Sequence, residues 1–473
     1  MPDRILLPLI VACALFMENL DSTVLATALP AIAKDFGASP IHLKLALTSY
    51  LLALAVFIPA SGWLADRYGA RTIFRLAITV FTLGSIACGL SNSIPEMVVA
   101  RVVQGLGGSM MMPVGRLVIL RSVPKHELVG SLAWLTIPAL VGPVVGPPVG
   151  GFITTYFDWR WIFWINVPVG ILGVTLATLF LPDIRGDARS RFDAIGFLLS
   201  ALGLALFITG STSLGLQLIP LAGVLAMLLV GVALLAAYVL RSRRMANPII
   251  DLSLLRIPTL GTSLLGTLFF RIGVGATPFL LPLLLQVGFG MTPFESGMIT
   301  FASAIGAMAM KFVTPAILRR QGFRRVLIVN ALIAAAFVAM PALFTPSTPV
   351  AVMASLLLIG GFFRSLQFTS VNALAFADVP PEKMSRATTI TSVAQQLSLS
   401  IGVSVGAIAL QFTVEATGGA LVPASFIPAF LVIGVVTALS AVPFARLAHD
   451  AGREVSGHRP LAPDPVTAMR DRG

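Results

Sequence analysis

Two carboxylic acids, Glu18 and Asp21, lie three residues apart in the middle of the first long apolar segment, residues 5–33. This spacing places them on one face of a helix. An ionised group at that depth in a bilayer is costly, so it faces a bundle interior or a water-filled cavity and marks a functional site. Burial and a neighbouring negative charge both favour the protonated form of a carboxylic acid. We therefore expect Asp21, together with Glu18, to bind and release a proton.

Arg101, in a later apolar segment, is the expected partner of Asp21. A helical rise of 1.5 Å per residue places the two at a similar depth, and an arginine within a bilayer needs a partner. If Asp21 alternates between Arg101 and a proton, proton release is coupled to helix movement; a permanent structural ion pair is the alternative. Gln104, one turn after Arg101, can share this network, and we assign it to the substrate cleft.

The composition indicates an integral membrane protein that uses the lipid bilayer as its partner. Of the 473 residues, 57% are hydrophobic and only 11% are charged, against about 25% in soluble domains. The apolar segments are long and do not alternate strictly with polar residues, which favours helices over a β-barrel. The net charge of +12 does not indicate a nucleic-acid partner, because the basic residues fall in the gaps between apolar segments.

Fourteen apolar segments predict fourteen membrane-spanning helices. They cover residues 5–33, 41–65, 72–91, 95–121, 127–155, 161–181, 193–211, 217–240, 257–288, 294–318, 325–344, 348–377, 384–414 and 421–447. The two terminal regions and alternate loop regions between the segments together hold 24 of the 32 basic residues, whereas the other loop regions hold only Lys34, Lys44 and Arg160. Because basic loops stay in the cytoplasm, both termini are expected there.

A short repeat suggests two related halves. Residues 67–71 (RYGAR) and 320–324 (RQGFR) both read R-x-G-x-R, each before an apolar helix. Repeated halves around a central cavity are typical of transporters. We expect an N-terminal six-helix bundle (1–181), an inserted hairpin with its linkers (182–256), a C-terminal six-helix bundle (257–447) and a cytoplasmic tail (448–473), expected to be disordered. The hairpin holds almost no charge, so we expect it at the periphery.

Five motifs occur in order along the chain. They are residues 20–24 (LDSTV) with 28–30 (ALP), 62–71 (GWLADRYGAR), 101–108 (RVVQGLGG), Gly142 with 146–151 (GPPVGG), and 159–168 (WRWIFWINVP). In these motifs the chain resembles the fourteen-span drug:proton antiporters of the major facilitator superfamily, the EmrB/QacA type, and most closely their MdtD/HsrA-like branch. The resemblance implies an all-α membrane fold, proton-coupled efflux of small molecules by alternating access, and no cofactor besides the coupling proton. One departure is Ala70, where the loop motif usually has a basic residue.

Two of the motifs have a conformational interpretation. Asp66, Arg67 and Arg71 form a charged cluster at the cytoplasmic end of the second span, where they can link the two halves in one conformation. The fifth segment carries small residues that allow close helix approach and prolines that bend the helix. Those assigned a role in rocking are Gly142, Gly146, Pro147, Gly150 and Gly151.

The substrate cleft is expected to carry positive charge. Its predicted members are Arg271, Arg364, Gln367, Asn372 and Gln395, because intramembrane cations and buried amides need partners or water. The two arginines can instead cap backbone carbonyls at broken helices. A positive cleft favours a specific exporter of an anionic metabolite or a metal chelate, such as a carboxylate complex, over a broad drug exporter. Both remain open, and a monomer is expected.

Other protein classes find little support. The four histidines, His42, His126, His449 and His458, all fall in loops or the tail. The chain has no hydrolase triad, no HExxH zinc motif and no phosphate-binding Walker loop, so neither an enzyme nor an ATP-driven pump is indicated. A sensor that does not transport is disfavoured because Asp21, Arg101 and the glycine motif of the fifth segment are intact. Uptake by symport is disfavoured only because that glycine motif resembles the one found in antiporters.

Overall fold

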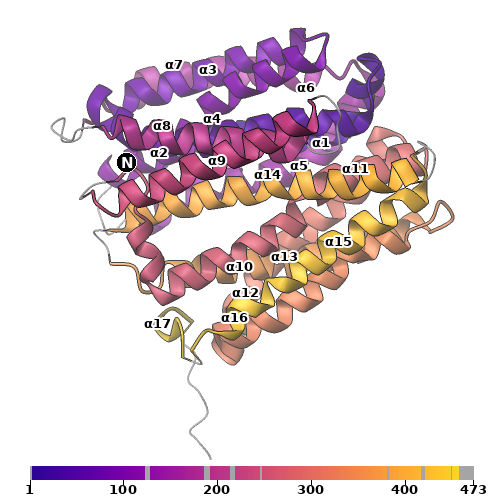
Figure 1. The fold of residues 1–473 in the computed structure, drawn as a ribbon. Coiled ribbons are helices and arrows are strands. Elements are labelled where there is room, and N and C mark those ends of the chain that lie inside the picture. The colour runs from indigo at the N-terminus through magenta and orange to yellow at the C-terminus, as the bar shows by residue number, and fades with distance from the viewer. Residues whose placement is uncertain are drawn as a thin grey trace, which may run out of the picture.

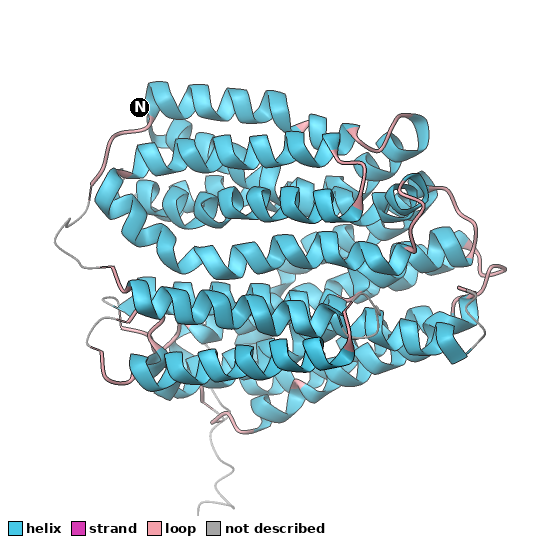
Figure 2. Ribbon diagram, turned by 45° about the horizontal axis from the view of Figure 1, so that its top comes forward, coloured by secondary structure: helices cyan, strands magenta, loops and turns pink. Residues whose placement is uncertain are grey.

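The computed structural model describes residues 3–122, 128–185, 192–213, 219–245, 248–380, 383–416, 421–448 and 450–456. All regular secondary structure in these residues is helical, which confirms the predicted all-α class. The helices run nearly parallel, with the connecting loops gathered at the two ends of the molecule (Figure 2). Figure 1 shows the helices of the first and last thirds of the chain in two neighbouring groups, which we call the N-half (α1–α7) and the C-half (α10–α16).

The long apolar runs form the helices that the sequence predicts. The N-half contains α1 (Asp3–Asp35), η1 (Pro40–Leu43), α2 (Lys44–Tyr68), α3 (Ala70–Leu90), α4 (Ile94–Ser122), α5 (Leu128–Tyr156), α6 (Trp161–Trp164) and α7 (Asn166–Phe180). A hairpin of α8 (Ala194–Ser213) and α9 (Leu221–Ser242) follows. The C-half contains η3 (Leu252–Arg256), α10 (Pro258–Gly275), α11 (Thr277–Leu283), η4 (Leu284–Gly288), α12 (Pro293–Ala339), η5 (Met340–Leu343), α13 (Val350–Ala375), α14 (Met384–Ala416), η7 (Pro423–Ser425), α15 (Phe426–Leu439) and α16 (Ala441–Ala445).

Twelve helical segments of the described chain are long and apolar enough to cross a membrane, so this is a multi-pass membrane protein. The predicted number was fourteen, and two places account for the difference. The twelve do not include α5, and they count residues 293–343 as one segment of 51 residues. That segment is interrupted at Gly322, whose φ of 72° and ψ of 163° are not helical. The count of fourteen therefore stays a prediction.

The two R-x-G-x-R loops turn the chain in the same way. Gly69 has φ 93°, and Gly322, at the same place in the second copy, has φ 72°. Residues with a Cβ rarely adopt positive φ, so glycine is the residue that permits both turns. The resemblance between the two pentapeptides therefore extends to their backbone conformation. Asp66 and Arg67 lie in the last turn of α2, and Arg71 lies in the first turn of α3.

The inserted hairpin lies at the periphery. Helix α8 packs against α9, α2 and α14, and Trp63 of α2 contacts Phe192 with ring centroids 4.7 Å apart. Only 17% of the most apolar stretch of α9 is buried, so most of its side chains face outward. Figure 1 shows α8 and α9 in front of the core helices. Most of α9 is therefore available to lipid, whereas α8 packs on α2 and α14.

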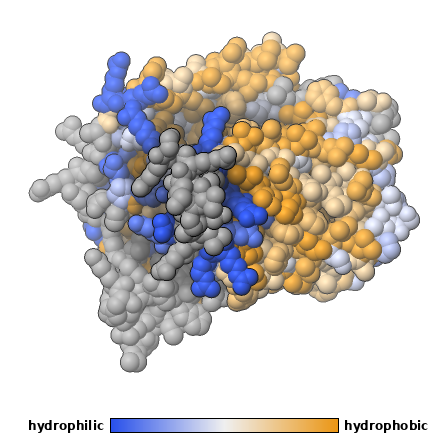
Figure 3. Space-filling model, turned by 90° about the horizontal axis from the view of Figure 1, so that it is seen from below, coloured by the Kyte–Doolittle hydropathy of each residue, from blue (hydrophilic) through white to orange (hydrophobic). Residues whose placement is uncertain are grey.

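The outer surface has the polarity of a membrane protein. Seen from the side of the C-half, a broad apolar face adjoins a strongly hydrophilic end (Figure 3). Large apolar side chains such as Phe312 of α12, 84% exposed, are available to lipid. The short helix α17 (Arg453–Ser456) packs on α12, so this part of the predicted disordered tail is ordered; residues 457–473 lie outside the described chain.

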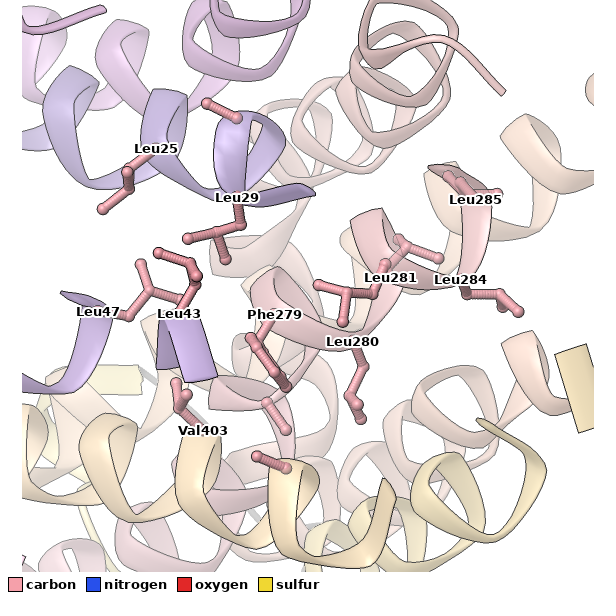
Figure 4. Close-up of a cluster of buried hydrophobic side chains, with 14 of the residues drawn as sticks. Leu25, Leu29, Leu43, Leu47, Phe279, Leu280, Leu281, Leu284, Leu285 and Val403 are labelled. Carbon is pink, nitrogen blue, oxygen red and sulfur yellow. The ribbon is translucent and has the colours of Figure 1, made fainter. Parts of the chain in front are cut away.

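The two halves are sealed together at one end by apolar side chains. Leu25 and Leu29 of α1, with Leu43 beside α2, meet Phe279 of α11 and Val403 of α14 (Figure 4). Two hydrogen bonds cross the same seam. Gln286 of η4 donates to the Thr27 carbonyl at 2.9 Å, and the Phe294 amide donates to the Thr155 hydroxyl at 2.9 Å. This end is called the sealed end below.

Candidate functional site

Asp21 lies at the centre of a buried polar network inside the N-half. Its Oδ2 is 2.5 Å from Nη1 of Arg101, and each side chain is only 1% exposed. Its Oδ1 accepts hydrogen bonds from Gln104 Nε2 at 2.9 Å and from Asn166 Nδ2 at 3.1 Å. The carboxylate thus has three donors from two other helices, α4 and α7. Charge-assisted bonds of this kind are the strong ones, and they hold Asp21 in one orientation.

Arg101 is enclosed as completely as its partner. Nη1 also donates to Gln104 Oε1 at 2.6 Å, and Nε donates to the Ala46 carbonyl at 3.2 Å. The guanidinium lies over the ring of Tyr50, 4.2 Å from its centroid. Removing one partner of a buried ion pair leaves an uncompensated charge, which is strongly destabilising. Each member of the pair therefore requires the other unless a proton or water replaces it.

The local sequence explains how the network is assembled. Asp21, with Glu18, interrupts an apolar helix, and Arg101 and Gln104 are spaced one turn apart on α4, so both reach the same side. Asn166 is the first residue of α7. Its amide also donates to the Ser85 hydroxyl of α3 at 2.9 Å, and that hydroxyl donates to the Phe163 carbonyl at 3.0 Å. Helices α1, α3, α4 and α7 are joined through this one carboxylate.

Glu18 differs from Asp21 in having no such set of donors. It is half-buried, and its Oε2 is buried without a hydrogen-bond partner in the described chain. The Tyr50 hydroxyl is also buried and unpartnered there. Of the two predicted acids, the structure therefore places only Asp21 in the ion pair.

The fifth-helix glycines face two different neighbours. Gly142, Gly146 and Gly150 pack on α1; a Cβ on Gly142 would lie 3.1 Å from the Phe16 carbonyl oxygen. Gly151 instead faces α12 of the C-half, where a Cβ would lie 2.9 Å from Phe294 Cα. The predicted stripe thus fixes α5 to the helix that carries Asp21 and also brings the two halves together.

A cavity of about 250 Å³ lies between the halves, away from the sealed end. Its lining comes from the second half of α4, the middle and second half of α10, the end of α13 and the beginning of α14. The lining residues are Met112, Arg116, Ser263, Leu264, Thr267, Arg271, Val371, Asn372, Ala375, Phe376, Thr388, Thr391, Ser392 and Gln395. The halves are therefore closed at one end and separated by a polar cavity toward the other.

Comparison with known proteins gives the family. The sequence profile of the Major Facilitator Superfamily matches residues 11–403 and 263–471. The chain is 39% identical over 451 residues to MdtD multidrug resistance proteins of Salmonella heidelberg (strain SL476) and Salmonella paratyphi A, which covers 93% of this chain and 94% of theirs. The chain belongs to the major facilitator superfamily. This confirms the predicted family and its MdtD-like branch, and it identifies a transporter, not an enzyme.

Solved structures show the same superfamily fold. The crystal structure of a D-xylose–proton symporter superimposes with a TM-score of 0.67 at 14% identity, covering 94% of this chain and 98% of the other. A bacterial homologue of the human lysosomal transporter Spinster, inward-facing and unoccupied, gives a TM-score of 0.60 at 17% identity, covering 98% and 100%. At these identities the likeness concerns the fold alone.

The cavity between the halves contains part of the predicted cleft. Arg271, Asn372 and Gln395 line it together. The other members lie elsewhere. Gln104 belongs to the Asp21 network, and Arg364 donates from Nη2 to the Ser303 hydroxyl at 3.1 Å.

Gln367 has a different environment from the one predicted. It is fully buried, accepts a hydrogen bond from Asn330 Nδ2 at 2.8 Å and donates to the Leu327 carbonyl at 3.2 Å. These bonds join α13 to the second part of α12. The prediction allowed a buried amide either a protein partner or water, and here the neighbouring helix satisfies Gln367.

Two residues of the sites were not singled out from the sequence. Asn166 occurs in the motif at 159–168, but only folding brings it to Asp21, 145 positions earlier. The feature of the sequence that could have identified Asn166 is that it is a single amide in an otherwise apolar stretch. Arg116 was not among the predicted cleft residues, and its place in the cavity depends on how α4 faces the C-half. No cluster of three or more His, Cys, Asp or Glu residues that could hold a metal ion occurs in the described chain.

Proposed function

We propose that this protein is a proton-coupled efflux antiporter that exports small molecules by alternating access. The observation that carries the proposal is the buried Asp21–Arg101 pair in a chain of the major facilitator superfamily. The multidrug resistance relatives support export as the direction of transport. The coupling ion in this proposal is the proton.

The network suggests how a proton is exchanged. With Asp21 ionised, Arg101, Gln104 and Asn166 satisfy its two oxygens. A proton on Asp21 removes the charge that Arg101 requires, so the guanidinium must find water or another partner, and the helices that carry the donors shift. When the pair re-forms, the proton is released. Glu18, one turn away and half-buried, is the group that relays the proton.

Alternating access follows from the seam between the halves. The sealed end is where α1 ends and α12 begins, and we place it at the outer face, so the cavity opens toward the cytoplasm. In this arrangement both termini are cytoplasmic and the membrane is a bacterial inner membrane. Adding α5 to the twelve apolar segments and dividing α12 at Gly322 gives fourteen crossings. The two six-helix bundles comprise residues 1–181 and 257–447, and the hairpin region lies between them in the sequence. The transporter acts as a monomer.

Inverted membrane vesicles test the proton assignment. Vesicles energised to an acidic interior should accumulate ethidium or fluorescein through the wild-type protein. Asp21→Asn keeps the size of the side chain and loses the charge, so it should abolish accumulation while the protein still folds. Asp158→Asn changes an exposed acid near Arg160 and is the matched control, expected to transport normally. Full proton-driven accumulation by Asp21→Asn would overturn the assignment.

A second candidate function is a specific exporter of an anionic metabolite or metal chelate, such as a carboxylate complex. It is favoured by one observation, namely that both charged residues lining the cavity, Arg116 and Arg271, are basic.

A further inference from the structure

The cavity between the halves carries a charge that its own lining does not balance. Arg116 comes from α4 of the N-half, and Arg271 comes from α10 of the C-half. None of the fourteen residues that line the described cavity is acidic. Arg101, by contrast, lies against Asp21. This chain therefore has one arginine neutralised inside the N-half and two others that line the cavity between the halves.

Several polar groups around this cavity have no protein partner. Arg271 is only 7% exposed, its guanidinium carbon lies 4.5 Å from the ring centroid of Phe368, and its Nε is buried without a hydrogen bond in the described chain. The Ser263 hydroxyl, two turns before it on α10, is also buried and unpartnered. For Arg116 the described chain provides no ion pair. Buried polar groups are normally satisfied, so unpartnered ones that line a cavity point to a ligand or to water.

The remaining lining suits the polar part of an organic molecule. Asn372 and Gln395 contribute amides, and Thr267, Thr388 and Ser392 contribute hydroxyls. A volume of about 250 Å³ holds roughly eight waters at ~30 Å³ each, which is also enough for a small ring or a short chain with its substituents. Guanidinium groups present a planar fork of donors that matches the two oxygens of a carboxylate or phosphate.

We propose that this cavity binds an organic anion whose oxygens bridge Arg116 of the N-half and Arg271 of the C-half. The inference rests on the proposed function in that the cavity is the cargo site, and it assigns the charge class of that cargo. Two guanidinium groups on opposite halves repel each other when the halves approach. An anion between them removes this repulsion, so cargo binding itself permits closure on this side, and the empty cavity resists it.

Binding measured in lipid nanodiscs tests the charge class without any proton gradient. The probes share one ring and differ in charge: terephthalate, phenylphosphonate, the neutral terephthalamide and the dication p-xylylenediamine. Titration calorimetry should give binding of at least one of the two anions and none of the amide or the diamine at the same concentration. The two anions distinguish carboxylate from phosphate-type cargo.

Three variants locate the binding. Arg116→Gln and Arg271→Gln each remove one charged donor, so each should weaken anion binding by about 10- to 100-fold. Lys311→Gln removes a half-buried cation of α12 that does not line the cavity, and it should bind as the wild type does. Matched melting temperatures show that the variants fold.

The outcomes separate this inference from the proton mechanism. Asp21→Asn keeps both cavity arginines and is read by proton coupling in vesicles, whereas Arg116→Gln and Arg271→Gln keep the Asp21–Arg101 pair and are read by anion binding in nanodiscs. Equal or tighter binding of the diamine or the amide would overturn the anionic class. Anion binding that is unaffected by both arginine variants would overturn the site. If the vesicles accumulate ethidium but no anion, and Asp21→Asn abolishes that accumulation, the Asp21 assignment stands while the anion site is refuted.

Discussion

The sealed end makes a strong prediction, because α5 and α12 touch there through backbone atoms. Gly151 faces Pro293 and Phe294, and Gly297 faces Pro147. A Cβ built on Gly297 would lie 2.9 Å from the carbonyl carbon of Pro147, closer than real Cβ atoms approach a backbone. Gly297→Ala therefore cannot be accommodated by a side-chain rotation, and the two helices must move apart.

The size of the effect follows from the cost of overpacking. Inserting a methyl group into a tight contact typically costs about 1–3 kcal/mol. The cost applies only while α5 and α12 are in contact, and it disappears when the halves separate at this end. The equilibrium between the sealed and the open state should therefore shift toward the open state by about 5- to 150-fold. A helical Gly→Ala change would otherwise stabilise the protein by about 1 kcal/mol.

Distance measurements between spin labels can detect the shift. Phe157, 59% exposed, and Met298, 44% exposed, lie on the N-half and C-half near the sealed end and can be replaced by labelled cysteines. The chain has only two cysteines, Cys13 and Cys88, which are first replaced by alanine. Gly297→Ala should add a population with a longer distance.

Gly62→Ala is the matched control for this experiment. Gly62 lies inside α2, and a Cβ there would meet no atom within 4 Å. It should leave the distances unchanged. If Gly297→Ala lowers the melting temperature but keeps the wild-type distances, the contact is static packing and the gating argument is refuted.

Two further predictions concern polar contacts. Asn166→Ala removes one of the three donors to Asp21, a loss of about 1.5–3 kcal/mol for a charge-assisted bond. It should reduce proton-driven transport in vesicles ten-fold or more, and undiminished transport would show that this donor is dispensable. Outside the membrane, burial alone would raise the pKa of Asp251, but hydrogen bonds from Ser253 and Arg386 lower it below its ordinary value of 3.8. A carboxyl group whose pKa is lowered in the folded state stabilises the protein above its unfolded-state pKa, and this stabilisation is lost as the pH falls through the folded-state pKa. Asp251→Asn should therefore be less stable than wild type by about 0.2–1 kcal/mol at pH 7, and the gap in melting temperature should close below about pH 4. A gap that does not change with pH would contradict the ion pair with Arg386.

Local sequence features predicted much of the fold. Apolar runs long enough to cross a bilayer became helices, since a lipid environment requires backbone groups to bond within the segment. The glycine of each R-x-G-x-R loop became a positive-φ turn, because few other residues permit that conformation. Within α12 the Gly322 turn interrupts the helix, and the helical stretches on either side of it meet at a kink.

The candidate sites were predicted less evenly. The pairing of Asp21 with Arg101 was predictable, because two opposite charges at one depth in an apolar medium have few other partners. The environment of Gln367 was not, since an amide can be satisfied by water or by a neighbouring helix, and only packing selects Asn330.

By itself, the sequence determined that the chain lies in a membrane as a set of helices and that an acid and a guanidinium share its interior. Both follow from the cost of moving polar groups out of water, which depends on residue type and on length along a helix. The tertiary structure decided which helix faces meet. It brought Asn166 to Asp21, placed Arg116 and Arg271 in the lining of one cavity, and closed one end of the seam at Gly151 and Gly297. Those contacts join residues far apart in the chain, and their geometry depends on the rotation and approach of whole helices.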